Sequence, residues 1–180
     1  LTLTTTGEQT VTATDTVGGE FGTQTAITVT PASLSYFVVD QIADPQVAGT
    51  PTSPRVTAYD LYDNIKTDYL GTVTFSSSDT KPTTVLPVDY TYLAGDNGRH
   101  TFTGELTLTT TGEQTVTATD TVGGEFGTQS AITVTPAALS YFVVDQIADP
   151  QVAGTPSSPR VTAYDLYDNI KTDYLGTVTF

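Results

Sequence analysis

A long internal repeat sets the unit that this chain must fold. Residues 1–75 align with residues 106–180 at an offset of 105 residues, and only three of the 75 aligned positions differ. The differences are Thr25/Ser130, Ser33/Ala138 and Thr52/Ser157. Residues 76–105 occur once. Because a fixed sequence period marks a repeated structural unit, the folding unit is predicted to be about 105 residues long.

Proline-containing segments mark the predicted boundaries between units. The segments TPAS at 30–33 and TPAA at 135–138 each separate two strand-like runs. Proline is common at strand ends and rare inside a ladder. The predicted domains are the C-terminal part of a preceding repeat at 1–33, one complete repeat at 34–137 and the N-terminal part of a following repeat at 138–180. Since both partial repeats lack the 76–105 block, we expect an excerpt of a longer tandem array, or a fibre whose neighbours complete one another.

Composition narrows the classes of function. The formal charge is −14, and residues 34–137 hold 12 acids against four bases. Such a surface disfavours nucleic acid and anionic membranes as partners. The chain has no cysteine, and no run approaches the roughly 20 apolar residues of a membrane helix. We predict an extracellular protein, at the cell surface or in a secreted filament, with no membrane insertion in this segment.

Alternation of apolar and polar residues predicts an all-β fold. Threonine and valine dominate, and both are β-branched residues that favour strands. Seven short strands separated by turn signals, in about 100 residues, predict an antiparallel β-sandwich of immunoglobulin type, repeated in tandem. The predicted strands of the complete unit are 35–40, 54–61, 69–76, 85–93, 100–109, 114–119 and 127–135, with loops at 41–52 and 77–84.

The same alternation predicts which side chains form the core. In each strand, the apolar residues spaced two apart face the same side of the sheet. The predicted core residues are Phe37, Val39, Val56, Ala58, Val73, Phe75, Phe102, Leu106, Leu108, Val116, Ala118, Ile132 and Val134.

Three stretches carry a resemblance to a known family. They are VTAYDLYDNIKTDYLGTVTFSSSD at 56–79, VLPVDYTYLAGDNGRHTF at 85–102 and TLTTTGEQTVTATDT at 107–121. Together they resemble the bacterial immunoglobulin-like repeats of large surface proteins, in particular the invasin/intimin-like group with its D-x-x-x-N turn, V-T-F strand and T-V-T-A strand. The resemblance implies an extracellular stalk, adhesin or filament module, in a family that is not enzymatic as a rule.

The D-x-x-x-N segments are the clearest candidate binding sites. Their closely spaced oxygen ligands could hold calcium, although aspartate and asparagine also build turns by bonding to their own backbone. We favour the turn and commit to no metal site or other cofactor. The calcium candidates are Asp60, Asp63, Asn64, Asp165, Asp168 and Asn169.

Other patterns allow further functions. Rows of threonine could bind ice, although outward positions of strands are often threonine. Exposed tyrosines could bind glycans, although packing roles are more common. Lys66 or Lys81 could form a crosslink to Asn64 or Asn97, the asparagines of the unit, but no sequence pattern supports it. His100 is the only histidine, and no G-x-S-x-G motif accompanies it, so we expect no enzymatic activity.

The short proline-containing joints favour a mechanical function. Such joints are stiff, so tandem units are expected to form a rod. The predicted function is a structural module of a long extracellular bacterial surface protein, forming a stalk or filament by tandem domains that are either self-contained or strand-complemented. Its expected partners are neighbouring copies of the same repeat or chain. The alternative is an adhesin module that binds glycan or host protein.

Overall fold

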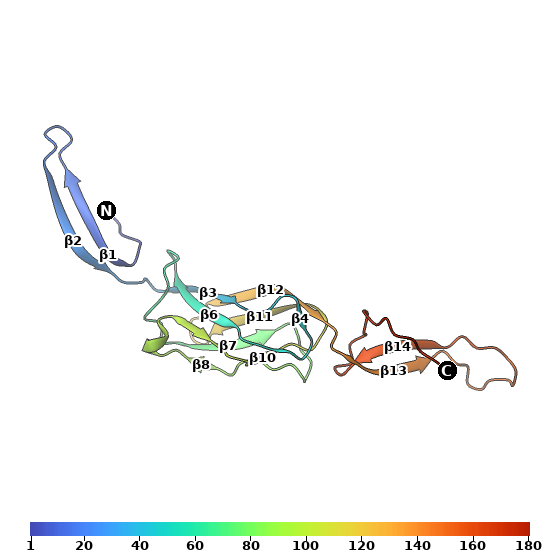
Figure 1. Cartoon of the computed structure of the whole chain (residues 1–180). Coiled ribbons are helices and arrows are strands. Elements are labelled where there is room, and N and C mark those ends of the chain that lie inside the picture. Colours follow the sequence, from blue (N-terminus) through green and yellow to red (C-terminus); the bar gives the residue numbers. More distant parts are fainter.

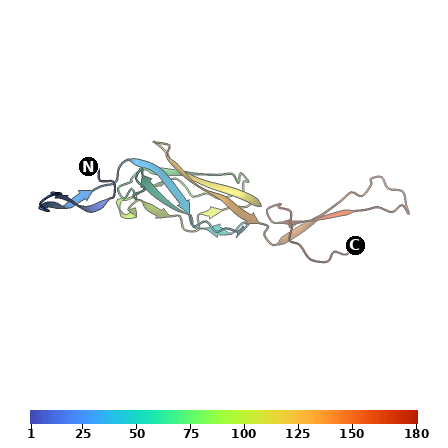
Figure 2. The same ribbon diagram turned by 90° about the horizontal axis from the view of Figure 1, so that it is seen from above.

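The computed structural model describes all residues, 1–180, as an extended all-β chain without an α-helix. In Figure 1, a hairpin, a central body and a second strand pair follow one another, with the two termini at the outer parts. Figure 2 shows the same row from above. The outer elements are β1 (Gly7–Thr14) with β2 (Phe21–Val29), and β13 (Leu139–Asp145) with β14 (Arg160–Asp165).

The central body contains two larger sheets and one short pair. One sheet has the strand order β3-β6-β9, the second has the order β4-β12-β11-β7-β8, and β10 pairs with β5. All of these pairings are antiparallel except that of β4 with β12. The bounds are β3 (Leu34–Asp40), β4 (Gln46–Val47), β5 (Pro51–Thr52), β6 (Arg55–Asp60), β7 (Thr72–Ser77), β8 (Tyr90–Thr91), β9 (Arg99–Thr101), β10 (Leu106–Thr107), β11 (Gly112–Asp120) and β12 (Phe126–Thr135).

One core of 16 buried residues joins the two sheets, an arrangement consistent with a β-sandwich. Twelve of the thirteen predicted core residues belong to it, so the alternation pattern is confirmed. The exception is Phe75, which packs on the edge of the core with its ring 4.7 Å from that of Phe102. The core also takes Ile42, Ala48, Tyr69 and Tyr92, which the sequence analysis did not assign.

The predicted strand at 100–109 is wrong, because the segment forms two strands in different sheets. β9 ends at Thr101 and pairs with β6, whereas β10 begins at Leu106 and pairs with β5. Gly104 lies between them at φ +70°, a left-handed conformation that interrupts an extended run. Its N–H donates to Ser53 Oγ (2.9 Å), which holds the bend against the loop before β6.

Three other predicted boundaries need correction. The strand expected at 85–93 is reduced to β8, since Pro87 has no N–H to donate to a ladder. The strand expected at 69–76 begins only at Thr72, because Tyr69 instead packs into the core. The predicted loop at 41–52 contains β4 and β5. The complete unit therefore has ten strands, β3 to β12, rather than seven.

Repeated sequence gives repeated local structure even where burial differs. The β1–β2 pair and the β11–β12 pair have the same register, including a shift between Gln9 and Val11 and between Gln114 and Val116. Val116 is fully buried, whereas Val11 is only half-buried. The hairpin geometry therefore follows from the local sequence and does not depend on the core beneath it.

Phe102→Ala should destabilise the central body by about 3–5 kcal/mol, since Phe102 is only 1% exposed and its loss leaves a cavity. The matched control is Phe126→Ala, at a position that is 61% exposed, and its effect should stay within about 0.5 kcal/mol. Chemical denaturation followed by circular dichroism measures both. Equal losses for the two variants would contradict this assignment of the core.

Candidate functional site: the junctions between repeat units

The D-x-x-x-N turn folds around a buried carboxylate. Asp60 Oδ1 accepts hydrogen bonds from the backbone N–H of Tyr62 (2.8 Å) and of Asn64 (2.9 Å). The Asn64 side-chain amide donates to both Asp60 oxygens, at 3.2 and 3.0 Å. Asp63 lies at φ +62°, a left-handed conformation in which aspartate is enriched. These bonds confirm that the segment is a turn.

The same turn also holds the segment that precedes the unit. Asp60 Oδ2 accepts the N–H of Ala32 (2.9 Å), in the connection between β2 and β3. Asn64 Nδ2 donates to the carbonyl of Thr4 (2.7 Å), and Asn64 Oδ1 accepts the N–H of Thr6 (3.1 Å). One aspartate and one asparagine therefore fix both the connecting segment and the residues that lead into β1.

The second junction repeats this set of bonds at an offset of 105 residues. Asp165 accepts the N–H of Ala137 (2.9 Å). Asn169 Nδ2 donates to the carbonyl of Thr109 (2.8 Å), and Asn169 Oδ1 accepts the N–H of Thr111 (3.3 Å). The three cross-junction bonds thus join corresponding atoms in both copies.

The 76–105 block adds a lysine to the second junction. Lys81 Nζ donates to Asn169 Oδ1 (2.9 Å) and to the carbonyl oxygen of Tyr167. The Tyr167 side chain lies directly against Gly49, where a Cβ would overlap the phenol ring. Gly49 also has φ +80°, so glycine is required there for both space and conformation.

Asp79 places the loop that carries Lys81. Its carboxylate is 4% exposed and accepts the backbone N–H of Thr109 (2.6 Å) and of Thr110 (2.8 Å), together with the Thr110 hydroxyl (2.6 Å). It also accepts the N–H of Lys81 (3.3 Å). Alternation and motif spacing do not predict this role. The one local signal for it was an aspartate in a serine-rich turn at the end of a strand.

The junction carboxylates are held in their charged form. Burial alone would raise the pKa of Asp60, but hydrogen bonds from Asn64, Ala32 and Tyr62 outweigh it and lower the pKa to about 2. The pKa values of Asp165 and Asp79 are lowered in the same way, by hydrogen bonds that outweigh the effect of burial. A carboxylate at these positions accepts backbone N–H groups throughout the neutral pH range.

The calcium candidates mostly bond to protein donors. The carboxylates of Asp60 and Asp165 accept the N–H groups described above, and those of Asp63 and Asp168 accept tyrosine hydroxyls at 2.7 and 2.6 Å. No group of three or more His, Cys, Asp or Glu residues is placed to hold a metal ion. Asp60, Asp63, Asn64, Asp165, Asp168 and Asn169 stay calcium candidates to which no metal site is assigned.

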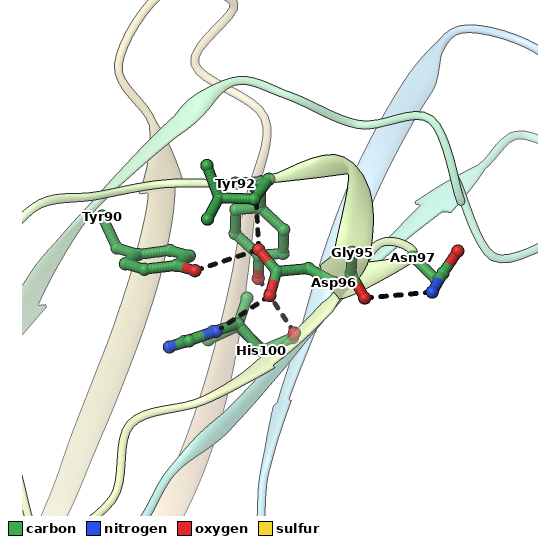
Figure 3. A network of polar contacts seen from close by, with 8 residues as sticks. Tyr90, Tyr92, Gly95, Asp96, Asn97 and His100 are labelled. Carbon is green, nitrogen blue, oxygen red and sulfur yellow. Dashed lines mark hydrogen bonds and ion pairs between the residues drawn. The ribbon is translucent and has the colours of Figure 1, made fainter.

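His100 belongs to an aromatic and acidic cluster on the edge of the central body (Figure 3). Its imidazole stacks on Tyr90, with ring centroids 3.8 Å apart, and Nδ1 lies 3.3 Å from Asp96 Oδ1. Asp96 Oδ2 also accepts the Tyr90 hydroxyl (3.0 Å) and the N–H of Leu93 (2.7 Å). No serine or threonine hydroxyl hydrogen-bonds to His100, and the structure contains no pocket.

Threonine pairs link neighbouring strands on their outward sides. Each pair brings two hydroxyls within hydrogen-bond distance across a ladder, as expected for outward strand positions. The pairs are Thr12 with Thr23 (2.9 Å), Thr72 with Thr91 (2.8 Å) and Thr117 with Thr128 (2.8 Å).

No helix in the structure is both long and apolar enough to cross a membrane.

Comparisons with known proteins give no relative on which to base a function. No family model matches the chain, and no curated protein matches it. The resemblance to bacterial immunoglobulin-like repeats therefore stays a prediction.

An NMR pH titration should show Asp60 with a pKa of about 2, below its ordinary value of 3.8. Because the folded pKa is lowered, Asp60 stabilises the first junction at pH values above about 4, and this contribution is lost as the pH falls through about 2. Asn64→Ala removes the main donor and should raise the pKa toward 3.8. A pKa of 3.8 or more in the unsubstituted chain would contradict the hydrogen-bond network.

Proposed function

We propose that the chain is a structural module of a long extracellular bacterial surface protein, in which successive units form a stalk or filament. The observation that carries this proposal is the pair of matching junctions. Domains joined by a flexible linker do not require hydrogen bonds between the side chains of one domain and the backbone of its neighbour. Here Asp60 with Asn64, and Asp165 with Asn169, each make three such bonds.

Bonds on both sides of a junction oppose bending in more than one direction. At the second junction, Ala137 bonds to Asp165 in the connecting segment, while Thr109 and Thr111 bond to Asn169 from the region where β11 begins. Because Asn169 is buried, with only 5% of its surface exposed, the two units have little room to adopt a second relative orientation. Repetition of one junction geometry along a chain produces a regular rod, which suits spacing or display.

We further propose that the complete unit at 34–137 is an immunoglobulin-like domain. Supporting this, its two sheets share one core, and every strand pairing except that of β4 with β12 is antiparallel. The chain has a net charge of −14, and such an acidic surface favours solubility outside the cell. Rods built from the same repeat would repel one another, which discourages lateral association.

The test is to examine the native polypeptide in its own organism. Antibodies against residues 34–137 should label intact cells or their shed filaments, and electron microscopy of the labelled material should show slender rods. The polypeptide that reacts on a denaturing gel should be much larger than 19.0 kDa. A compact intracellular protein would contradict the proposal.

A further inference from the structure

A lysine amine and an asparagine side-chain amide meet across the second junction. Lys81 belongs to the complete unit and Asn169 to the next one, 88 residues further along the chain, yet Lys81 Nζ lies 2.9 Å from Asn169 Oδ1. The pairing was not predictable within one unit, since the expected partners of Lys81 were Asn64 and Asn97. Asn64 bonds at the other end of the unit, and Asn97 donates to the carbonyl of Gly95 (3.0 Å).

We propose that Lys81 and Asn169 form a covalent isopeptide bond that staples one unit to the next. This modification goes beyond the proposed structural role and does not depend on where the protein is located. The reactants are a primary amine and a carboxamide, and the product is a secondary amide with release of ammonia. No oxidant, reductant or added reagent enters the reaction.

The reaction balances with the groups at the site. Lys81 first loses a proton from its ammonium group to solvent, since only the neutral amine is nucleophilic. Nζ then moves from Oδ1 to the adjacent Cγ of Asn169 and forms the new C–N bond. The surplus proton on Nζ passes through solvent to Nδ2. The Cγ–Nδ2 bond breaks, and ammonia leaves.

The surroundings of Asn169 fix the side chain for this reaction. Oδ1 receives two donors, Lys81 Nζ and the N–H of Thr111, while Nδ2 faces two acceptors, the carbonyl of Thr109 and Asp165 Oδ2. This pattern defines which amide atom is oxygen and which is nitrogen. The N–H of Thr111, at 3.3 Å, is placed to stabilise the negative charge that develops on Oδ1.

Asp165 orients the amide nitrogen that must leave. Its side chain is fully buried, and its Oδ2 lies 2.8 Å from Nδ2, the atom that must be protonated to leave. Burial alone would raise the pKa of Asp165, but hydrogen bonds from Asn169, Ala137 and Tyr167 lower it, so the group stays a carboxylate that accepts the Nδ2 hydrogen bond and holds the amide in place.

The other lysines of the repeat have different partners. Lys66 forms an ion pair with Asp68 (2.8 Å), and its copy Lys171 forms the same pair with Asp173 (2.7 Å). No lysine forms a hydrogen bond with the side chain of Asn64, the copy of Asn169. The chain therefore contains one reactive pair and a built-in control asparagine.

Mass spectrometry of the purified 180-residue chain, incubated after folding, tests the proposal. One bond lowers the intact mass by about 17 Da, the mass of the released ammonia. Trypsin should then give a branched peptide that joins residues 67–99 to residues 161–171. Residues 67–99 stay together in either case, because Pro82 follows Lys81 and blocks cleavage there.

Three variants separate the bond from other causes of mass loss. Lys81→Arg keeps the positive charge but cannot form the amide, and Asn169→Ala removes the acceptor, so both should retain the full mass. Asn64→Ala should still lose one ammonia. Full mass in the unsubstituted chain after prolonged incubation, or a mass loss that persists in Lys81→Arg, would overturn the proposal. The structural role would stand in that event, since it rests on the hydrogen bonds of both junctions.

Discussion

The structure depends on a buried carboxylate that bonds to backbone N–H groups on both sides of a junction. Asp60 and its copy Asp165 each close their own turn and also bind the segment that enters the unit. A buried charge is unfavourable unless hydrogen bonds compensate it. Removal of the entering segment would leave one oxygen without its backbone partner, so the turn and the junction stabilise each other.

This coupling explains how a local motif can set a long-range geometry. The asparagine that completes the motif is close to its aspartate in sequence, but its other bonds reach residues 58 to 60 positions earlier in the chain. Because the bonds recur at both junctions, orientation between units is encoded in the repeat itself. Lys81, Gly49 and Tyr167 then add charge and shape complementarity at the second junction.

The sequence predicted the parts of the fold that depend on local pattern. Alternation identified Val56 and Ala58 as core residues, and the D-x-x-x-N spacing identified the turn at Asp60. The split of 100–109 was missed because it depends on the conformation of Gly104. The contacts of Asp79 and Lys81 with later residues were missed for a different reason: they form only when distant segments meet, which no local periodicity reports.

The D-x-x-x-N turn is expected to fix the orientation of successive units. The distribution of distances between two spin labels, one on each side of the second junction, tests this most directly. The chain has no cysteine, so Thr103→Cys and Thr172→Cys introduce two exposed spin-label sites without competing thiols. Pulsed electron paramagnetic resonance should give one narrow distribution, which Asp165→Ala with Asn169→Ala broadens and the control Asp173→Ala leaves unchanged. An equally broad distribution in the parent and the double variant would contradict the account.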